Sequence, residues 1–289
     1  MNESGQSVRK KLSAVDLAAA KGGVPLTMLA LYDVQMARLA EESGIDILLV
    51  GDSMGMVVMG LESTTAVTMD DVLHHAASVR RGAPNTHVIG DLPFMSYQIS
   101  DAQAVENAGR LVKEAGVDSV KLEGGVAMAD RIRAISRIGI PVVAHIGMLP
   151  QTAGAQGGFK VQGREITAAR QLIADAAAVA GAGAIAIVIE LVPAELAEVI
   201  TRSVRVPTIG IGAGNGCDGQ VLVAPDLLGM DDRFRPKFLK PYANLAGTIR
   251  DAFAEYAADV RTRAFPDVAH SFKLPAETLN ALEADSKPE

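Results

Sequence analysis

The sequence is poor in cysteine, in aromatic residues and in clustered positive charge. It has one Cys and no Trp in 289 residues, and aromatic residues make up 4%. A single Cys excludes a disulfide framework and a cysteine-based zinc site, and so few rings leave little for the stacking platforms of single-strand binders. The 27 basic residues are outnumbered by 34 acidic ones, and the net charge of −7 comes without basic clusters. This argues against general nucleic-acid binding and against binding to anionic membranes.

Long hydrophobic runs are missing as well. The longest uncharged stretch of small apolar residues covers positions 176–189 and is interrupted by glycine. A membrane-spanning helix needs about 20 apolar residues, so no membrane span is predicted. The opening MNESGQSVRKK has basic residues but no apolar segment after them, so no secretory signal is predicted. We therefore expect a cytoplasmic protein.

Short apolar runs alternate with longer amphipathic stretches through the whole chain. Eight runs are apolar on both faces, which is typical of parallel strands covered by helices. They are Pro25–Leu31, Ile45–Val50, Thr86–Asp91, Ser119–Leu122, Pro141–His145, Ala184–Glu190, Pro207–Ile211 and Gln220–Ala224. Helical patterns cover Asp33–Ser43, Met69–Arg81, Asp101–Ala115, Val126–Ile138, Ile166–Ala180, Ala194–Ser203 and Asn244–Thr262. Asp33, Thr68 and Ser100 are expected to cap three of these helices.

This alternation favours a single (β/α)8 TIM barrel over a Rossmann-like sheet with a small second domain. We expect residues 1–23 to form an N-terminal extension with a helix that plugs the barrel bottom. Residues 24–265 would form the barrel and 266–289 a C-terminal tail, disordered over its last ten residues. The Gly/Gln-rich stretch Gly147–Gly163 is expected to be a long functional loop after the fifth strand.

Three carboxylates end consecutive predicted strands: Asp52, Asp91 and Glu123. Catalytic residues of a barrel come from these strand ends, and neighbouring strands lie about 4.8 Å apart, so the three can converge on one ion. Oxygen ligands without cysteine suit Mg²⁺ or Mn²⁺. For a single Asp, a helix cap or surface position is the simpler interpretation. Three at equivalent positions favour a metal site.

Other charged residues end the fourth, fifth and sixth strands. Lys121 shares a strand face with Glu123 and could pair with a substrate carboxylate or enolate oxygen, or only with the acidic cluster. His145 is more typical of a hydrogen-bonded core histidine than of a metal ligand, although it could border the pocket. Glu190 follows an apolar run, a setting that favours a general acid or base, or it caps the next helix.

The glycines at 214, 216 and 219 match the spacing GxGxxG, but a strand is predicted after them where a dinucleotide site needs a helix. We reject that interpretation. A phosphate site in this loop stays open, although the loop has no Lys, Arg, Ser or Thr of its own. Cys217 is expected to be a small packing residue, not a nucleophile.

With these motifs in view, the chain resembles the ketopantoate hydroxymethyltransferase family. The matching blocks run in order over roughly residues 20–272: VGDSMGM at 50–56, RRGAP at 80–84, DLPFMSY at 91–97, VKLEGG at 120–125, AHIGMLPQ at 144–151, GGFKVQGR at 157–164, IELVP at 189–193, IGIGAGN at 209–215 and a short AHSF. One departure is Ala30-Leu31-Tyr32-Asp33, where the family usually reads TAYD.

The resemblance implies a TIM barrel of the phosphoenolpyruvate mutase/isocitrate lyase superfamily. It implies Mg²⁺ held by Asp52, Asp91 and Glu123, and a keto acid contacted by Asp52, Ser53, Asp91 and Lys121. Glu190 would be the proton acceptor. The implied reaction moves a one-carbon unit from 5,10-methylenetetrahydrofolate to C3 of 3-methyl-2-oxobutanoate. The family also implies a homo-oligomer, usually a decamer.

Two alternatives remain. One is another Mg²⁺-dependent enzyme of the superfamily that makes or breaks C–C or P–C bonds of a 2-oxo acid. Such relatives usually carry a reactive Cys in a KKCGH-type motif, which this sequence lacks. The other is a non-catalytic ligand-binding barrel, which would have no need of three convergent carboxylates and Lys121. Because Trp is absent, we expect polar and aliphatic contacts to bind the pterin ring.

Overall fold

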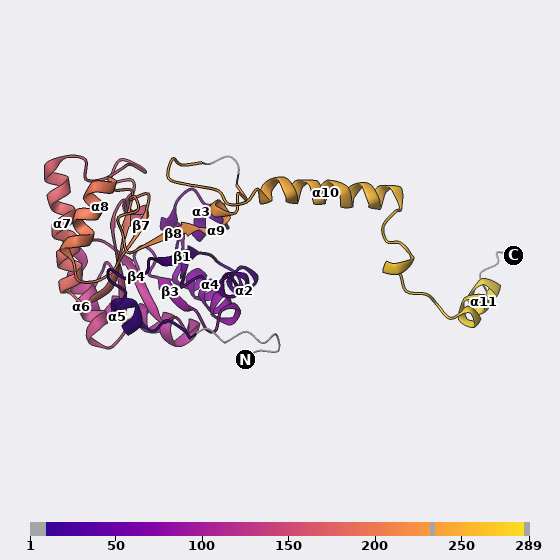
Figure 1. Ribbon diagram of the computed structural model, residues 1–289. Coiled ribbons are helices and arrows are strands. Elements are labelled where there is room, and N and C mark those ends of the chain that lie inside the picture. The colour runs from indigo at the N-terminus through magenta and orange to yellow at the C-terminus, as the bar shows by residue number, and fades with distance from the viewer. Residues whose placement is uncertain (1–9, 232–234, 286–289) are drawn as a thin grey trace.

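A computed structural model describes residues 10–231 and 235–285. Eight parallel strands pair in chain order, and β1 also pairs with β8, so the sheet closes into a barrel (Figure 1). The strands are β1 (Leu26–Ala30), β2 (Ile47–Val50), β3 (His87–Asp91), β4 (Ser119–Glu123), β5 (Val142–Gly147), β6 (Ala184–Glu190), β7 (Thr208–Ile211) and β8 (Gly219–Val223). The predicted barrel is confirmed, with each strand within a few residues of its predicted bounds.

Helices surround most of the barrel. They are α2 (Val34–Glu42), α3 (Met54–Val57), α4 (Met69–Gly82), α5 (Asp101–Arg110), α6 (Ala129–Arg137), α7 (Ile166–Gly181), α8 (Ala194–Ser203) and α9 (Ala224–Leu227). Short 3₁₀ turns are η1 (Thr64–Ala66), η3 (Val126–Met128) and η4 (Pro150–Thr152). The side chains of Asp33, Thr68 and Ser100 accept hydrogen bonds from backbone N–H groups of the first turns of α2, α4 and α5, as predicted.

One predicted helix, Asp101–Ala115, changes character part way. The α-helix α5 ends at Arg110, and a π-helical segment, η2 (Leu111–Ala115), completes the stretch. Gly116 then ends it with a left-handed backbone (φ 71°). Hydrophobic periodicity cannot reveal this change, because Leu111 and Ala115 are buried in either form of helix.

The barrel interior is filled by apolar side chains from alternating strand positions, including Met28, Ile47, Ile89 and Val143. Helix α1 (Ala14–Ala18) lies before the first strand, and its Leu17 is fully buried within this interior cluster. His87 also ties this segment to the barrel, because its ring lies 2.9 Å from the Leu12 carbonyl and 2.9 Å from Ser119 Oγ. The part of the N-terminal segment that contains Leu12 and Leu17 therefore packs against the barrel core.

Aspartates join neighbouring strands at the end of the barrel where the strands begin. Each directly precedes an even-numbered strand and accepts a backbone N–H from the strand before it. An aspartate carboxylate oxygen accepts the backbone N–H in each pair. Asp46 accepts from Thr27 at 2.9 Å, Asp118 from Val88 at 2.9 Å and Asp218 from Thr208 at 2.8 Å. Such charge-assisted bonds hold the strand register at the end opposite the strand-end carboxylates.

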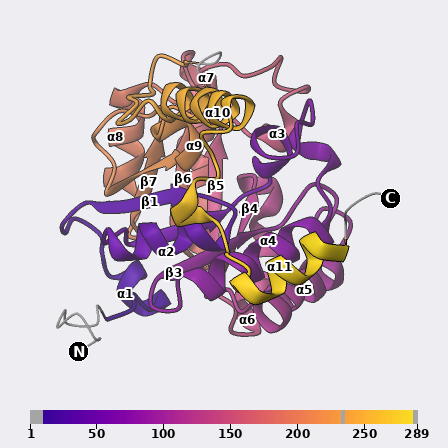
Figure 2. The same ribbon diagram turned by 90° about the vertical axis from the view of Figure 1, so that its right-hand side faces the viewer.

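From Leu245 onward, the chain leaves the barrel as an extended arm. It contains α10 (Leu245–Thr262), η5 (Val268–His270) and α11 (Ala276–Asp285). Figure 1 shows the arm projecting away from the barrel, and Figure 2 views it end on, in front of the barrel. In α10 only Ala246 is buried. The helix predicted over Asn244–Thr262 is therefore present but does not cover the barrel. The expected disorder of the last ten residues is wrong up to Asp285, and positions 286–289 lie outside the described residues.

The glycine-rich stretch after β7 forms a tight loop that runs directly into β8. A side chain at position 214 would come within 2.4 Å of Ala194 Cβ, and one at position 219 within 2.6 Å of the Leu26 carbonyl. Close packing therefore explains these two glycines. Cys217 is buried in the hydrophobic core, as a packing residue would be.

Within the described residues, no helix is long and apolar enough to cross a membrane.

Candidate active site

The carboxyl ends of β2, β3 and β4 bring three buried carboxylates together. Asp91 and Glu123 are the last residues of β3 and β4, and Asp52 follows β2 by two residues. Burial raises the pKa of Asp52 well above its usual value, and the negative charges of Asp91 and Glu123 raise it further. Burial likewise raises the pKa of Asp91. Mutual repulsion of this kind requires the three groups to be near neighbours.

Lys121 supplies the positive charge at the centre of this cluster. Its Nζ lies 2.9 Å from Asp91 Oδ2, and both side chains are almost fully buried. Burial would lower the pKa of Lys121, but the three surrounding carboxylates outweigh it, so the pKa is raised and the ammonium stays charged. The ion pair with the acidic cluster that the sequence left open is therefore present. Lys121 also lies at the same end of the barrel, where it could meet a substrate.

His145 connects the cluster to Glu190. Its Nδ1 lies 3.4 Å from Glu123 Oε1, and its Nε2 lies 3.2 Å from Glu190 Oε2, without the alignment of a hydrogen bond. Burial and Lys121 would lower the pKa of His145, but the two glutamates outweigh them and raise it to about 9. His145 is thus a buried, charged bridge between two carboxylates.

The Glu190 side chain is the accessible member of this group, with 16% of it exposed, compared with 2% for Glu123. It does not cap the following helix, because the N-cap of α8 is Pro193. Its surroundings are also less apolar than the sequence suggests, since its carboxylate faces the His145 ring. A reactant entering from this end could therefore reach Glu190 directly.

Ser53 lies beside Asp52 at the start of α3. Its Oγ is 2.8 Å from the hydroxyl of Tyr32, a buried side chain that follows β1. The Tyr32 carbonyl in turn lies 2.7 Å from His75 Nδ1. Because the Tyr32 ring is fixed by burial, its hydroxyl orients the Ser53 side chain. The aspartate and the serine of the GDS motif thus reach the same end of the barrel.

Gln151 and Tyr97 also belong to the site, although neither was predicted from the sequence as a site residue. Gln151 Nε2 donates to Asp52 Oδ2 at 2.9 Å, and its backbone N–H donates to Glu123 Oε2 at 3.0 Å. The Tyr97 hydroxyl donates to Gln151 Oε1 at 2.7 Å. Both residues come from loops after strands β5 and β3. The only sequence signal was their presence in the DLPFMSY and AHIGMLPQ blocks.

Among the described residues, two buried carboxylate oxygens, Asp91 Oδ1 and Glu123 Oε1, have no hydrogen-bond partner. Burying such an oxygen lowers the stability of the fold unless a cation or a hydrogen-bond donor faces it. Within the described ranges, no three His, Cys, Asp or Glu side chains already surround one point as metal ligands would. The magnesium site therefore stays a prediction.

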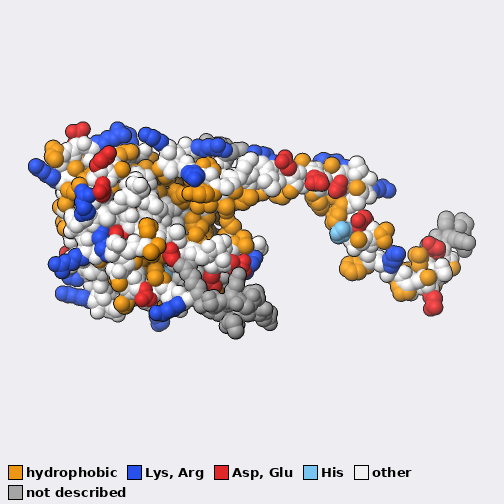
Figure 3. All heavy atoms as spheres, in the orientation of Figure 1, with side chains coloured by type: hydrophobic (Ala, Val, Ile, Leu, Met, Phe, Trp, Pro, Cys, Tyr) orange, Lys and Arg blue, Asp and Glu red, His pale blue; other side chains and the backbone are white. Residues whose placement is uncertain are grey.

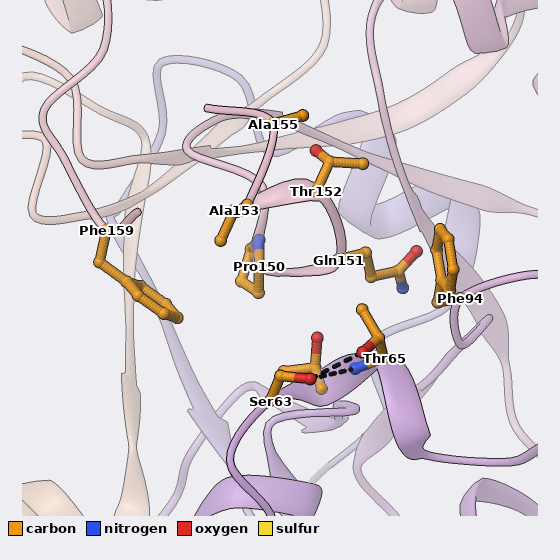
Figure 4. Close-up of a pocket in the computed structure, with 11 residues that line it drawn as sticks. Ser63, Thr65, Phe94, Pro150, Gln151, Thr152, Ala153, Ala155 and Phe159 are labelled. Carbon is orange, nitrogen blue, oxygen red and sulfur yellow. Dashed lines mark hydrogen bonds between the residues drawn. The ribbon is translucent and has the colours of Figure 1, made fainter. Parts of the chain in front are cut away.

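A cavity of about 430 Å³ opens next to this cluster (Figure 4). Its walls come from η1, from the loop after β3 and from the long loop after β5. The labelled lining residues include Ser63, Thr65, Phe94, Gln151 and Phe159. Because Gln151 both lines the cavity and contacts Asp52, the cavity and the carboxylates are neighbours.

The chain is similar to known proteins over most of its length. A family model described as ketopantoate hydroxymethyltransferase matches residues 11–268. The 3-methyl-2-oxobutanoate hydroxymethyltransferase of Desulfotalea psychrophila is 51% identical over 276 residues, which cover 95% of this chain and 99% of the relative.

Solved structures resemble the fold at much lower identity. One is 2,3-dimethylmalate lyase, a member of the PEP mutase/isocitrate lyase superfamily, with a TM-score of 0.56 and 16% identity over 95% of this chain and 99% of the other. Another is phosphonopyruvate hydrolase in complex with oxalate and Mg²⁺, with a TM-score of 0.59 and 16% identity over 94% and 98%. These two support the barrel fold alone, whereas the family match spans most of the sequence. The chain belongs to the ketopantoate hydroxymethyltransferase family.

Proposed function

We propose that this chain transfers a one-carbon unit from 5,10-methylenetetrahydrofolate to C3 of 3-methyl-2-oxobutanoate. With one water molecule, the products are 2-dehydropantoate (ketopantoate) and tetrahydrofolate. The observation that carries the proposal is the 51% identity, over 95% of the chain, to an enzyme named for this keto acid and this transfer. The grouping of carboxylates, Lys121 and Glu190 at one end of the barrel supports it.

Asp52, Asp91 and Glu123 are the residues that would hold Mg²⁺. Carboxylate oxygens are the ligands Mg²⁺ prefers, and Asp91 Oδ1 and Glu123 Oε1, which accept no hydrogen bond from the described residues, fit a cation. Phosphonopyruvate hydrolase, which shares the fold, has been solved with oxalate and Mg²⁺. When bound, Mg²⁺ would polarise the keto group and stabilise negative charge that develops on its oxygen.

Lys121 and Ser53 would bind the keto acid. The buried Lys121 ammonium can pair with the substrate carboxylate in a setting of low dielectric, where such a contact is strong. The Ser53 hydroxyl, oriented by Tyr32, can donate a second hydrogen bond. These contacts would fix the keto acid with C3 toward β6, where the accessible Glu190 lies.

Glu190 would take the proton from C3. Its Oε2 contacts His145, so the carboxylate is oriented without being buried. Removal of the proton leaves an enolate, whose C3 forms the new bond to the methylene carbon of the folate. Both carbon–nitrogen bonds of that carbon break. Water supplies the hydroxyl group of the product, and the two folate nitrogens take up one proton from that water and the one removed from C3. His145 is a positioning residue in this scheme, because it contacts Glu190 and Glu123 and holds them on opposite sides of its ring.

The cavity beside Gln151 is our candidate for the folate. Phe94 and Phe159 both line it, so an aromatic contact with the pterin ring is available beside the polar and aliphatic contacts expected from the sequence (Figure 4). The remaining lining residues are small or polar, among them Ser63, Thr65 and Thr152. A ring bound here would lie next to the carboxylate cluster, as transfer to C3 requires.

The direct test is to incubate the protein with both substrates and Mg²⁺ and to detect ketopantoate by mass spectrometry. The proposal predicts product that depends on the folate, disappears with EDTA and returns with added Mg²⁺. Cleavage or rearrangement of the keto acid without folate would instead favour another reaction of the superfamily. Binding without turnover would favour a non-catalytic barrel.

We also propose that the chain forms a homo-oligomer in the cytoplasm, with a decamer expected. The arm exposes large apolar side chains, among them Phe253 (70% exposed), Tyr256 and Phe272. Figure 3 shows further hydrophobic side chains gathered on the barrel below the start of α10. Met56, Val57, Val58 and Met59, in and just after α3, are also exposed. Apolar surface of this extent is typical of subunit contacts.

The oligomer is tested by light scattering after size-exclusion chromatography. Wild-type protein should elute as one large assembly. The double substitution Phe253→Glu and Tyr256→Glu should reduce its mass, whereas Glu255→Gln, on the same helix, should not. A wild-type monomer would contradict the proposal.

A further inference from the structure

Gln151 makes every hydrogen bond that its side chain allows, although it lies on a long loop. Nε2 donates to Asp52 Oδ2 and to the Leu92 carbonyl, each at 2.9 Å. Oε1 accepts from the Tyr97 hydroxyl at 2.7 Å and from Gln98 Nε2 at 3.3 Å. A buried amide with two donors and two acceptors filled can adopt one orientation only. The side chain is therefore fixed by four partners.

The backbone of the same residue reaches a second carboxylate. The Gln151 N–H donates to Glu123 Oε2 at 3.0 Å, so one residue contacts Asp52 after β2 and Glu123 at the end of β4. Tyr97 strengthens this link, because its hydroxyl also accepts the Glu123 N–H at 3.1 Å. In each carboxylate, the oxygen bonded by Gln151 is held in place. Glu123 Oε1 accepts no hydrogen bond within the part of the chain that the structure describes, although His145 Nδ1 lies 3.4 Å from it.

Gln151 is also the point where the cavity wall meets the carboxylates. It lies in η4, between Pro150 and Thr152, and these three residues line the cavity together (Figure 4). Movement of this loop must therefore move a donor that contacts Asp52 and a donor that contacts Glu123. Partners that orient metal ligands typically change metal affinity 10- to 100-fold when they are removed.

We infer that Gln151 is a positioning residue that presents Asp52 and Glu123 to Mg²⁺ and links their geometry to the loop that walls the folate cavity. This inference rests on the proposed function, because it takes these carboxylates as the metal ligands. Gln151 itself does not touch the reacting atoms. Its effect is exerted through the two carboxylates.

Gln156 provides a matched control on the same loop. Its Oε1 accepts the Leu149 N–H at 2.9 Å and its Nε2 donates to the Gly147 carbonyl at 3.2 Å. It therefore anchors the loop but is hydrogen-bonded to neither Asp52 nor Glu123. Gln151→Met and Gln156→Met make the same chemical change, and each removes the hydrogen bonds of one amide side chain.

Calorimetric titration of the full-length protein with Mg²⁺, without substrates, tests the inference. Gln151→Met should raise the Kd for Mg²⁺ at least 10-fold, and Gln156→Met should leave it within about 2-fold of wild type. An unchanged Kd in Gln151→Met, or equal losses in both variants, would overturn it. If wild-type protein bound no Mg²⁺, the proposed metal site itself would be wrong and this inference would fall with it.

Tyr97→Phe covers the case in which Gln151→Met does not fold. It removes the hydroxyl that donates to Gln151 Oε1 and accepts the Glu123 N–H, and it should weaken Mg²⁺ binding several-fold in the same direction. Turnover gives a second readout: with Gln151→Met, kcat should recover at high Mg²⁺. An unchanged Mg²⁺ affinity in Tyr97→Phe, or a loss of kcat in Gln151→Met that Mg²⁺ does not rescue, would contradict the inference.

Discussion

His145 Nε2 lies 3.2 Å from Glu190 Oε2, so the most accessible carboxylate of the site is held by a buried imidazole. The other ring nitrogen lies 3.4 Å from Glu123 Oε1. One histidine therefore separates the carboxylate that we assign to Mg²⁺ from the one that we assign to proton removal. Protonated, it offsets the negative charge on both sides.

This contact predicts that one histidine stays protonated at neutral pH in metal-free protein. The two glutamates raise the pKa of His145 to about 9 against the opposing effect of burial. Because the pKa is raised on folding, the stabilisation is complete below about pH 6.5 and is lost as the pH rises through 9. NMR titration in EDTA checks this, with His145→Gln to assign the signal. Titration of every histidine below pH 7 would contradict it.

A second prediction concerns the orientation of Ser53. Tyr32→Phe removes the hydroxyl 2.8 Å from Ser53 Oγ and leaves the buried ring in place. One hydrogen bond contributes about 1 kcal/mol, so KM for the keto acid should rise roughly 5-fold with little change in folding. Steady-state kinetics measure this, and Tyr242→Phe, on an exposed ring, is the control. An unchanged KM would argue against a substrate contact by Ser53.

A third prediction tests the folate cavity. Phe159→Ala removes one of its two phenyl rings and should raise KM for 5,10-methylenetetrahydrofolate about 2- to 13-fold, because a stacking or edge contact contributes roughly 0.5–1.5 kcal/mol. KM for the keto acid should stay the same. The exposed Ile138, which follows α6, offers Ile138→Ala as a control. Equal changes in both KM values would indicate that the cavity does not separate the two substrates.

The strand ends could be predicted from the sequence, whereas the loop contacts could not. Asp52, Asp91 and Glu123 follow apolar runs, and closure of the barrel places such strand ends together. Gln151 is different, because its contacts with Asp52 depend on the path of the loop after β5. The direction of α10 could not be predicted from the sequence either, because an amphipathic pattern does not reveal which surface a helix faces.

A fourth prediction concerns stability at the opposite end of the barrel. Asp218 accepts hydrogen bonds from Lys21 Nζ at 2.9 Å, the Gly22 N–H at 2.9 Å and the Thr208 N–H at 2.8 Å. Burial would raise the pKa of Asp218, but these bonds outweigh it and lower the pKa. Asp218→Asn should therefore cost about 2–3 kcal/mol of unfolding free energy.

The pH dependence of that loss has a defined sign. Because the pKa of Asp218 is lowered on folding, its stabilisation is present above about pH 4 and is lost as the pH falls further. Urea unfolding at pH 7 and at pH 3.5 measures both values, and the difference between wild type and Asp218→Asn should shrink at the lower pH. A constant difference would show that the carboxylate charge is not responsible.

The removal of the C3 proton is the central step, and hydrogen exchange into deuterated water measures it without the folate. Wild-type protein with Mg²⁺ should exchange the C3 proton of 3-methyl-2-oxobutanoate, as followed by proton NMR. Glu190→Gln should slow this exchange about 10²- to 10⁴-fold while still binding Mg²⁺ and the keto acid. Glu195→Gln, on the exposed face of α8, should exchange at the wild-type rate. Exchange by Glu190→Gln at the wild-type rate would contradict the assignment of Glu190 as the base.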